Sequence, residues 1–281
     1  MMRIMPYRTV KHAGLTIEGL SLAGVQTYWR VPELKIGFDL GGCPWQFLST
    51  PNWFISHTHL DHISMLPLLV GRRYFLGQTP PKIYLPHEAV RPVEIILAQY
   101  RRLDRGRYEA ELIGVEPGDE IRIGRELIVE VVEVDHYPVG LGYIAWNIRR
   151  KLREEFQHLS QEEIRNLAVA GTEVSRELRR PQVAYLGDTS PRGLDRNPTM
   201  YEAQILIAEM TFLSEDDDDT LAILSKRRHM HLRHFIERRE LFKNELIIAS
   251  HISTRYHPKQ AAAIVEQAIP DMLDGRLRLI M

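Results

Sequence analysis

The sequence predicts an α/β fold, in which short apolar strands alternate with amphipathic helices. Trp53-Phe54-Ile55 is an apolar run that follows Pro51-Asn52 and has the length of a buried strand. Residues 63–73 come next and place apolar side chains at helical spacing. Residues 82–86 are then typical of a strand and residues 90–102 of a helix. This alternation indicates a sheet that helices cover.

Composition and charge are those of an ordinary globular protein. The chain has 281 residues, 44% hydrophobic and 26% charged, which suits a single domain over residues 1–281. Its 36 basic and 37 acidic side chains give a formal net charge of −1, so a globally basic nucleic-acid binder is not indicated. One cysteine, Cys43, fits a reducing cytoplasm. The first nine residues lack the apolar core of a signal peptide, and no apolar run approaches membrane-spanning length, so no membrane partner is expected.

A dense polar motif follows the strand at residues 53–55. From His57 to His62, three imidazoles and one carboxylate fall within six positions. In extended backbone, residues i and i+2 point to the same side, so His57 and His59 can bind one ion. Asp61 and His62 follow a change of direction and can face a second ion. Imidazole and carboxylate at this density suit zinc or a similar divalent metal. A polar surface loop is the alternative, and it leaves the position directly after an apolar strand unexplained.

The His-x-His-x-Asp-His pattern resembles that of the metallo-β-lactamase superfamily. Further segments, spread over most of the chain, are similar to its ribonuclease Z branch. They are Leu66-Pro67-Leu68-Leu69, His136 with Gly142-Tyr143, Glu209-Met210-Thr211-Phe212, and His251-Ile252-Ser253-Thr254-Arg255-Tyr256. The resemblance implies a four-layer αββα sandwich with metals held at one edge, by loops between strands and helices.

The resemblance also implies a ligand set for two divalent ions, zinc or alternatively manganese. It assigns His57, His59 and His136 to one ion, Asp61, His62 and His251 to the other, and Asp188 to both. Two such ions a few ångströms apart lower the pKa of a shared water toward neutrality, so that hydroxide forms without a protein nucleophile.

Catalysis and proton transfer are expected from three residues. Asp61 can orient the attacking water as well as bind metal. His231, held by Glu209, is the candidate that protonates the leaving alkoxide. His229 and His234 are its rivals within a segment expected to be helical. The acidic run at residues 215–219 is expected to begin a helix, where the macrodipole favours negative charge.

Substrate contact is expected from Arg255 and Tyr256, which follow the last ligand. The planar guanidinium of Arg255 fits phosphate oxygens. The alternative for Arg255 is a salt bridge to a ligand carboxylate.

The resemblance implies phosphodiester hydrolysis, and within this branch the expected reaction is 3′-end processing of tRNA precursors. The expected assembly is a homodimer. The interval of about residues 148–180 is predicted to be a charged helical insertion. Ribonuclease Z usually has a protruding arm with a Gly-Pro-rich tip there, and this interval has no Gly-Pro. No tRNA-binding arm is therefore evident, and small phosphodiesters are expected as substrates beside RNA. The alternatives are a small-molecule phosphodiesterase, another ester or lactam hydrolase, and a catalytically inactive RNA-binding relative.

Overall fold

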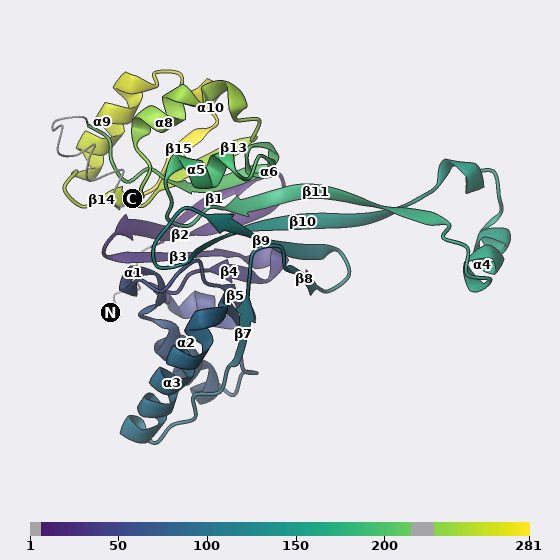
Figure 1. Ribbon diagram of the computed structural model, residues 1–281, viewed down its shortest axis with the longest axis horizontal. Helices are drawn as coiled ribbons and strands as arrows, with labels where there is room; N and C mark the ends of the chain where they lie inside the picture. Colours follow the sequence, from purple (N-terminus) through teal and green to yellow (C-terminus); the bar gives the residue numbers. More distant parts are fainter. Residues whose placement is uncertain (1–6, 215–227) are drawn as a thin grey trace.

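The computed structural model describes residues 7–214 and 228–281, and the acidic run at residues 215–219 lies outside them. Within the described residues, two β-sheets face one another and helices cover their outer sides (Figure 1). The predicted α/β fold, an αββα four-layer sandwich, is thereby confirmed.

The first sheet contains the N-terminal half of the fold. Its strands follow the order β1-β2-β3-β4-β5-β6-β7, with β14 paired to β2. Strands β1 to β4 pair antiparallel and β4 to β7 pair parallel. The bounds are β1 Arg8–His12, β2 Leu15–Ala23, β3 Gln26–Val31, β4 Ile36–Phe38, β5 Asn52–Phe54, β6 Lys82–Pro86, β7 Glu111–Val115 and β14 Ile252–Ser253.

The second sheet has the order β15-β13-β12-β11-β10-β9-β8. Its strands β11, β12, β13 and β15 are parallel neighbours, and β12 and β13 are buried along their whole length, as sheets covered on both faces require. The bounds are β8 Glu120–Ile123, β9 Leu127–Val134, β10 Gly140–Leu152, β11 Ser175–Tyr185, β12 Ile205–Glu209, β13 Leu246–Ser250 and β15 Leu277–Leu279.

The helices divide between the two outer layers. In Figure 1, α2 and α3 lie beside the first sheet, and α5, α6, α8, α9 and α10 lie beside the second. Their bounds are α1 Leu60–Ile63, α2 Leu66–Phe75, α3 Val90–Asp104, α4 Gln161–Val169, α5 Pro191–Asp195, α6 Thr199–Glu202, α8 Leu232–Glu237, α9 Pro258–Ala268 and α10 Met272–Gly275. No helix in these described ranges is long and apolar enough to cross a membrane.

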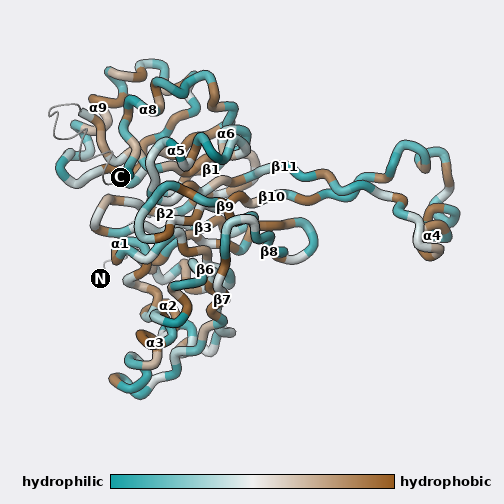
Figure 2. Tube along the Cα trace, viewed as in Figure 1, coloured by the Kyte–Doolittle hydropathy of each residue, from teal (hydrophilic) through white to brown (hydrophobic). Residues whose placement is uncertain are grey.

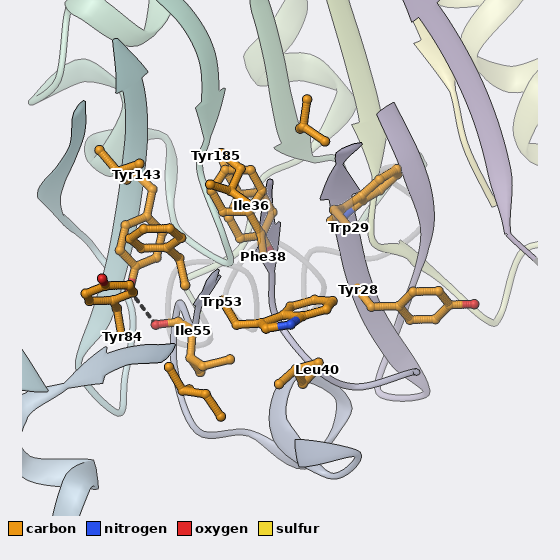
Figure 3. Close-up of a cluster of buried hydrophobic side chains, with 14 of the residues drawn as sticks. Tyr28, Trp29, Ile36, Phe38, Leu40, Trp53, Ile55, Tyr84, Tyr143 and Tyr185 are labelled. Atoms are coloured by element: carbon orange, nitrogen blue, oxygen red, sulfur yellow. Dashed lines mark hydrogen bonds between the residues drawn. The ribbon is translucent and has the colours of Figure 1, made fainter. Parts of the chain in front are cut away.

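Aromatic side chains fill the space between the sheets (Figure 3). Phe38 stacks on Tyr185 with ring centroids 4.8 Å apart, so that β4 of the first sheet contacts β11 of the second. The Tyr143 hydroxyl donates a hydrogen bond of 2.6 Å to the carbonyl of Ile55. These contacts fix the loop after β5, which carries the polar motif, against the opposite sheet.

The structure of residues 148–180 differs from the predicted helical insertion. Strands β10 and β11 continue past the sandwich as an antiparallel pair from Asn147 and Arg180 to Leu152 and Ser175, and only residues 161–169 form an α-helix. This hairpin, with α4 at its far end, protrudes as an arm that was not evident in the sequence (Figure 1). Figure 2 shows hydrophilic colours over much of its length. Charged side chains on both faces obscured the period-two pattern of a strand, because beyond Ile148 the arm has no buried side.

Candidate metal centre

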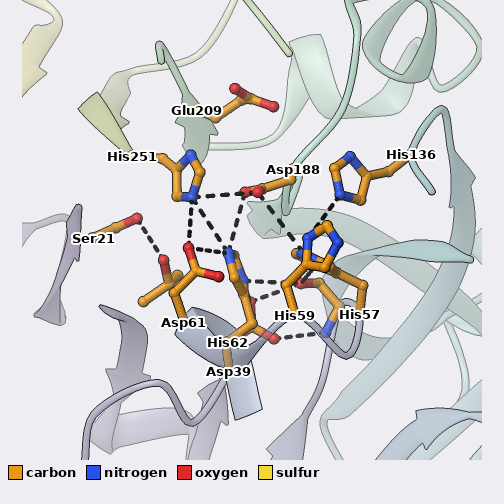
Figure 4. A network of polar contacts seen from close by, with 12 residues as sticks. Ser21, Asp39, His57, His59, Asp61, His62, His136, Asp188, Glu209 and His251 are labelled. Atoms are coloured by element: carbon orange, nitrogen blue, oxygen red, sulfur yellow. Dashed lines mark hydrogen bonds and ion pairs between the residues drawn. The ribbon is translucent and has the colours of Figure 1, made fainter. Parts of the chain in front are cut away.

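The candidate ligands meet at one edge of the sandwich, where several strands end (Figure 4). Each parallel strand of a sheet brings its carboxyl end to the same edge, and loops at that edge can converge on a ligand. The donors are His57 and His59 after β5, Asp61 and His62 on α1, His136 after β9, Asp188 after β11 and His251 after β13. The structure therefore brings together all seven residues that the sequence predicted.

One group of donors consists of His57, His59, His136 and Asp188, whose ligand atoms lie within 4.8 Å of one another. Nε2 of His57 lies 2.9 Å from Nδ1 of His59, and Nε2 of His136 lies 3.4 Å from the same atom. Burial lowers the pKa of His57 well below its ordinary value and that of His136 to about 4. These imidazoles are therefore neutral at neutral pH, the form that binds metal.

A second group consists of Asp61, His62 and His251. Nε2 of His62 lies 3.4 Å from Nε2 of His251, which lies 3.4 Å from Oδ2 of Asp61. Burial alone would raise the pKa of Asp61, but its hydrogen bond with His251 and the charges of His62 and His251 together outweigh burial and lower that pKa to about 2. This carboxylate is ionised and can accept a cation.

Asp188 lies between the two groups. Its Oδ1 is 3.4 Å from Nε2 of His62, and its Oδ2 is 3.3 Å from Nε2 of His251 and 3.9 Å from Nε2 of His57. Donors of one tetrahedral zinc ion are separated by roughly 3.3 Å, given zinc–nitrogen distances near 2.0 Å. Most of these separations are close to that value. Ring nitrogens whose lone pairs face one another without an intervening charge would repel, so the donor set fits divalent cations.

A buried carboxylate, Asp39, orients His62 of the second group. Its Oδ2 lies 2.7 Å from Nδ1 of His62, and this contact directs Nε2 of that ring toward the other candidate donors. Asp39 also accepts hydrogen bonds from the backbone N–H of Ser56 at 2.6 Å, from its hydroxyl at 2.7 Å, and from the Tyr185 hydroxyl. The turn after Asp39 approaches α1 so closely that a Cβ on Gly41 would lie 1.6 Å from the carbonyl oxygen of Asp61. The sequence analysis assigned Asp39 no role.

We expect Asp39→Asn to weaken metal binding by about 10–100-fold, the usual cost of losing a partner that orients a ligand. The amide keeps the shape of the side chain and removes the charge that holds His62. Titration of metal-depleted protein with zinc would measure the change. Asp119→Asn is the matched control, because Asp119 is an exposed turn residue. Equal zinc affinity in both variants would contradict the assigned role of Asp39.

A buried carboxylate and imidazole stand next to the metal groups. Both Glu209 oxygens lie 3.1 Å from Nδ1 of His229, and the His229 ring lies 5.7 Å from that of His251, centroid to centroid. Glu209 is held in turn by the backbone N–H of Thr189 at 2.5 Å and by the Thr211 hydroxyl, which lies 3.0 Å from Nδ1 of His251. Burial would lower the pKa of His229, but the charge and hydrogen bond of Glu209, together with the charge of Asp188, outweigh burial and raise that pKa to about 9.

The expected pairing of His231 with Glu209 is therefore wrong, and His229 is the partner of Glu209. His231 precedes α8 as its N-cap, where Nδ1 accepts a hydrogen bond of 3.0 Å from the backbone N–H of Arg233. Nε2 of His231 lies 3.3 Å from the carbonyl of Ser214. His229 and His231 also lie before the helix, which begins at residue 232, so the expected helical arrangement of the three histidines was wrong. His234 lies inside α8, where its Nδ1 accepts from the backbone N–H of His231.

The two predicted substrate contacts occupy different environments. Arg255 is exposed, with its guanidinium 5.4 Å from the ring centroid of Phe212. Its salt bridge to a ligand carboxylate is not formed among the described residues. Tyr256 is 7% exposed, and its hydroxyl lies 3.3 Å from the backbone nitrogens of Leu213 and Ser214. Tyr256 thus fixes the segment after β12, and its hydroxyl is engaged in that task.

Known proteins resemble this chain over most of its length. No family model matches the chain. It is 35% identical over 268 residues to tRNase Z TRZ1 of Arabidopsis thaliana, with 94% of each chain covered. It is 32% identical over 246 residues to the chloroplastic tRNase Z TRZ2 of the same plant, covering 87% of this chain and 69% of the relative.

Solved structures show the same fold at low sequence identity. The metallo-β-lactamase fold protein YhfI of Bacillus subtilis superposes with a TM-score of 0.58 at 13% identity, covering 92% of each chain. The short form of human tRNase Z superposes with a TM-score of 0.51 at 16% identity, covering 89% of each chain. Because the Arabidopsis likeness runs along nearly the entire sequence and the fold agrees with it, this chain belongs to the tRNase Z family of metallo-β-lactamase-fold proteins.

Proposed function

We propose that this protein is an endoribonuclease that removes 3′ trailers from tRNA precursors, with two Zn²⁺ ions as its cofactor and Mn²⁺ as a substitute. The observation that carries the proposal is the pair of adjoining donor groups that share Asp188. Family membership at 35% identity supports RNA as the substrate class. A single phosphodiester bond is hydrolysed in each turnover.

The metals, when bound by the two groups, supply Lewis acidity toward phosphate oxygens and a water that is nucleophilic at neutral pH. Asp61 would help to hold the second ion, and its Oδ2 is fixed by a 2.7 Å hydrogen bond from the backbone N–H of Gly24. The same carboxylate would orient the attacking water. The buried Asp188 carboxylate keeps the two groups at a fixed separation, so the site is organised before substrate arrives.

Proton delivery falls to His229 in this proposal. Glu209 occupies Nδ1 of His229, so Nε2 is the nitrogen that donates a proton to the leaving ribose oxygen. Thr211 links Glu209 to the ligand His251, which keeps donor and ligand in one hydrogen-bonded unit. Arg255, exposed beyond Phe212, remains the candidate contact for a substrate phosphate.

We expect purified protein to cleave a tRNA precursor at the base of its 3′ trailer and also to hydrolyse bis-p-nitrophenyl phosphate. Chelation should remove both activities, because the proposed mechanism activates water through the bound metals, and added zinc or manganese should restore them. Gel analysis of the precursor and elemental analysis of the protein are the measurements. Activity that survives complete metal removal would contradict the proposal. Diester turnover without precursor cleavage would favour a small-molecule phosphodiesterase.

We also propose a homodimer in the cytoplasm. Helix α3 presents Ile95, Ile96, Tyr100 and Leu103 with 43–78% of each side chain exposed, and exposed apolar groups of this extent favour a protein interface. A monomer mass in light scattering at micromolar concentration would contradict the dimer. The single cysteine, Cys43, suits a reducing compartment.

A further inference from the structure

A third group of possible metal donors overlaps the two groups already described. It consists of Asp188, His229 and His251, whose ligand atoms lie within 4.8 Å of one another, the same limit that holds for each of the other two groups. Asp188 belongs to the first group as well, and His251 belongs to the second. His229 is therefore the donor that distinguishes the third group. We call this group the alternative site.

The surroundings of His229 are those of a metal ligand. A histidine that binds metal usually directs its other ring nitrogen to a carboxylate, which fixes the orientation of the ring. Glu209 contacts Nδ1 of His229 at 3.1 Å, as Asp39 contacts Nδ1 of His62 at 2.7 Å. Both carboxylates are buried. Nε2 of His229 is thereby left for a metal, as Nε2 of His62 is.

The alternative site and the second group lie on opposite sides of donors that both can use. The ring of His229 lies 5.7 Å from that of His251, centroid to centroid, with an angle of 25° between the ring planes. In the view of Figure 4, Glu209, which holds His229, and Asp61 of the second group lie on opposite sides of Asp188 and His251. An ion held by Asp188 and His251 can therefore complete its coordination on either side.

We propose that Asp188, His229 and His251 form an alternative position for the second divalent ion, in which His229 is a metal ligand and no longer donates a proton. The inference rests on the two-metal centre of the proposed function. Nδ1 of His251 lies 3.0 Å from the Thr211 hydroxyl, so Nε2 is its metal-binding nitrogen, and one lone pair holds one ion at a time. The second ion therefore occupies either the second group or the alternative site.

Asp61 favours the second group as the position of this ion. The second group can bind through two carboxylates, Asp61 and the adjoining Asp188, and the alternative site binds through Asp188. A further negative ligand strengthens attraction of a divalent cation. An ion at the alternative site must also displace the proton that Glu209 stabilises on His229. Asp61 is thus a positioning residue as well as a ligand, because it keeps the second ion away from His229.

The test is a zinc titration of metal-depleted, full-length protein, with Asp61→Asn and His229→Ala made singly and together. His229→Ala alone should leave the Kd of both binding steps within about twofold, because the second group is intact. In the Asp61→Asn background, the same substitution should raise the Kd of the second step by about tenfold or more, because the ion then depends on His229. Competition with a chelating dye reports each Kd and the stoichiometry.

His158→Ala, made in both backgrounds, is the matched control and should change neither Kd. His158 is an exposed histidine outside the three donor groups. An effect of His229→Ala on the second Kd that is the same in both backgrounds, whether large or absent, would overturn the alternative site. Should Asp61→Asn fail to fold by circular dichroism, Asp61→Ser tests the same dependence, because its hydroxyl is also a hydrogen-bond acceptor for the backbone N–H of Gly24.

Anomalous diffraction at the zinc edge, from crystals of zinc-loaded Asp61→Asn, locates the ion directly. We expect an ion at bonding distance, about 2.0–2.1 Å, from a ring nitrogen of His229. An ion bound by His62 and His251, with His229 not coordinated, would overturn the proposal. Precursor cleavage by the unmodified protein, measured separately, decides the proposed function. The titrations and crystals contain no RNA, and they decide the alternative site.

Discussion

Asp188→Ala is expected to abolish hydrolysis of both tRNA precursor and bis-p-nitrophenyl phosphate and to lower the metal content of the protein. The two oxygens of Asp188 lie 3.3–3.4 Å from ring nitrogens of His251 and His62, and one of them lies 3.9 Å from His57 of the other group. The substitution removes the carboxylate that approaches both groups, so binding of both ions should weaken. Elemental analysis and turnover of both substrates are the measurements.

Two further variants make this result specific. Asp188→Asn keeps the volume of a side chain that is 4% exposed, so it separates loss of charge from a packing defect. Asp119→Ala, an exposed carboxylate far along the chain, should keep full metal content and activity. Normal turnover in Asp188→Ala, or full loss of turnover in a variant that still binds two metals with native affinity, would contradict the bridging assignment.

The convergence of the seven candidate ligands was predictable because it depends on local order in the sequence. His57, His59 and His62 follow an apolar strand at fixed spacing, and the geometry of a strand and a turn then determines which way they face. His136, Asp188 and His251 follow β9, β11 and β13, which run in the same direction and therefore deliver their carboxyl ends to one edge of the sheet. The position of each residue just after its own strand was therefore enough to predict that these side chains meet.

The supporting residues were not predictable because they depend on contacts between distant segments. Asp39 reaches His62 from the end of β4, and nothing in the turn at residues 39–42 indicates which side chain it meets. His229, His231 and His234 have similar sequence surroundings, and the approach of β12 selects His229 as the partner of Glu209. Spacing along the chain could not separate these candidates.

The prediction for residues 148–180 failed for a different reason. A strand is recognised by the alternation of buried and exposed side chains, and the outer part of β10 is exposed on both faces at Arg149, Arg150 and Lys151. Its pairing with β11 joins residues as distant in the sequence as Asn147 and Arg180, through backbone hydrogen bonds that depend little on side-chain identity.

His229→Ala is expected to lower kcat for precursor cleavage by about 10²–10⁴-fold with metal content unchanged, the range for loss of a general acid. Glu209, 3.1 Å from Nδ1 of His229, holds the ring, so Glu209→Gln should also lower kcat, and the double variant should lose little more than His229→Ala alone. His231→Ala is the matched control: it removes the N-cap of α8 and should lower Tm while kcat of the folded protein changes little. Bis-p-nitrophenyl phosphate, whose leaving group needs no proton, should be hydrolysed by His229→Ala at a rate closer to that of the unmodified protein. If His231→Ala shows the large loss in kcat and His229→Ala does not, or if His229→Ala loses metal, His229 is not the proton donor.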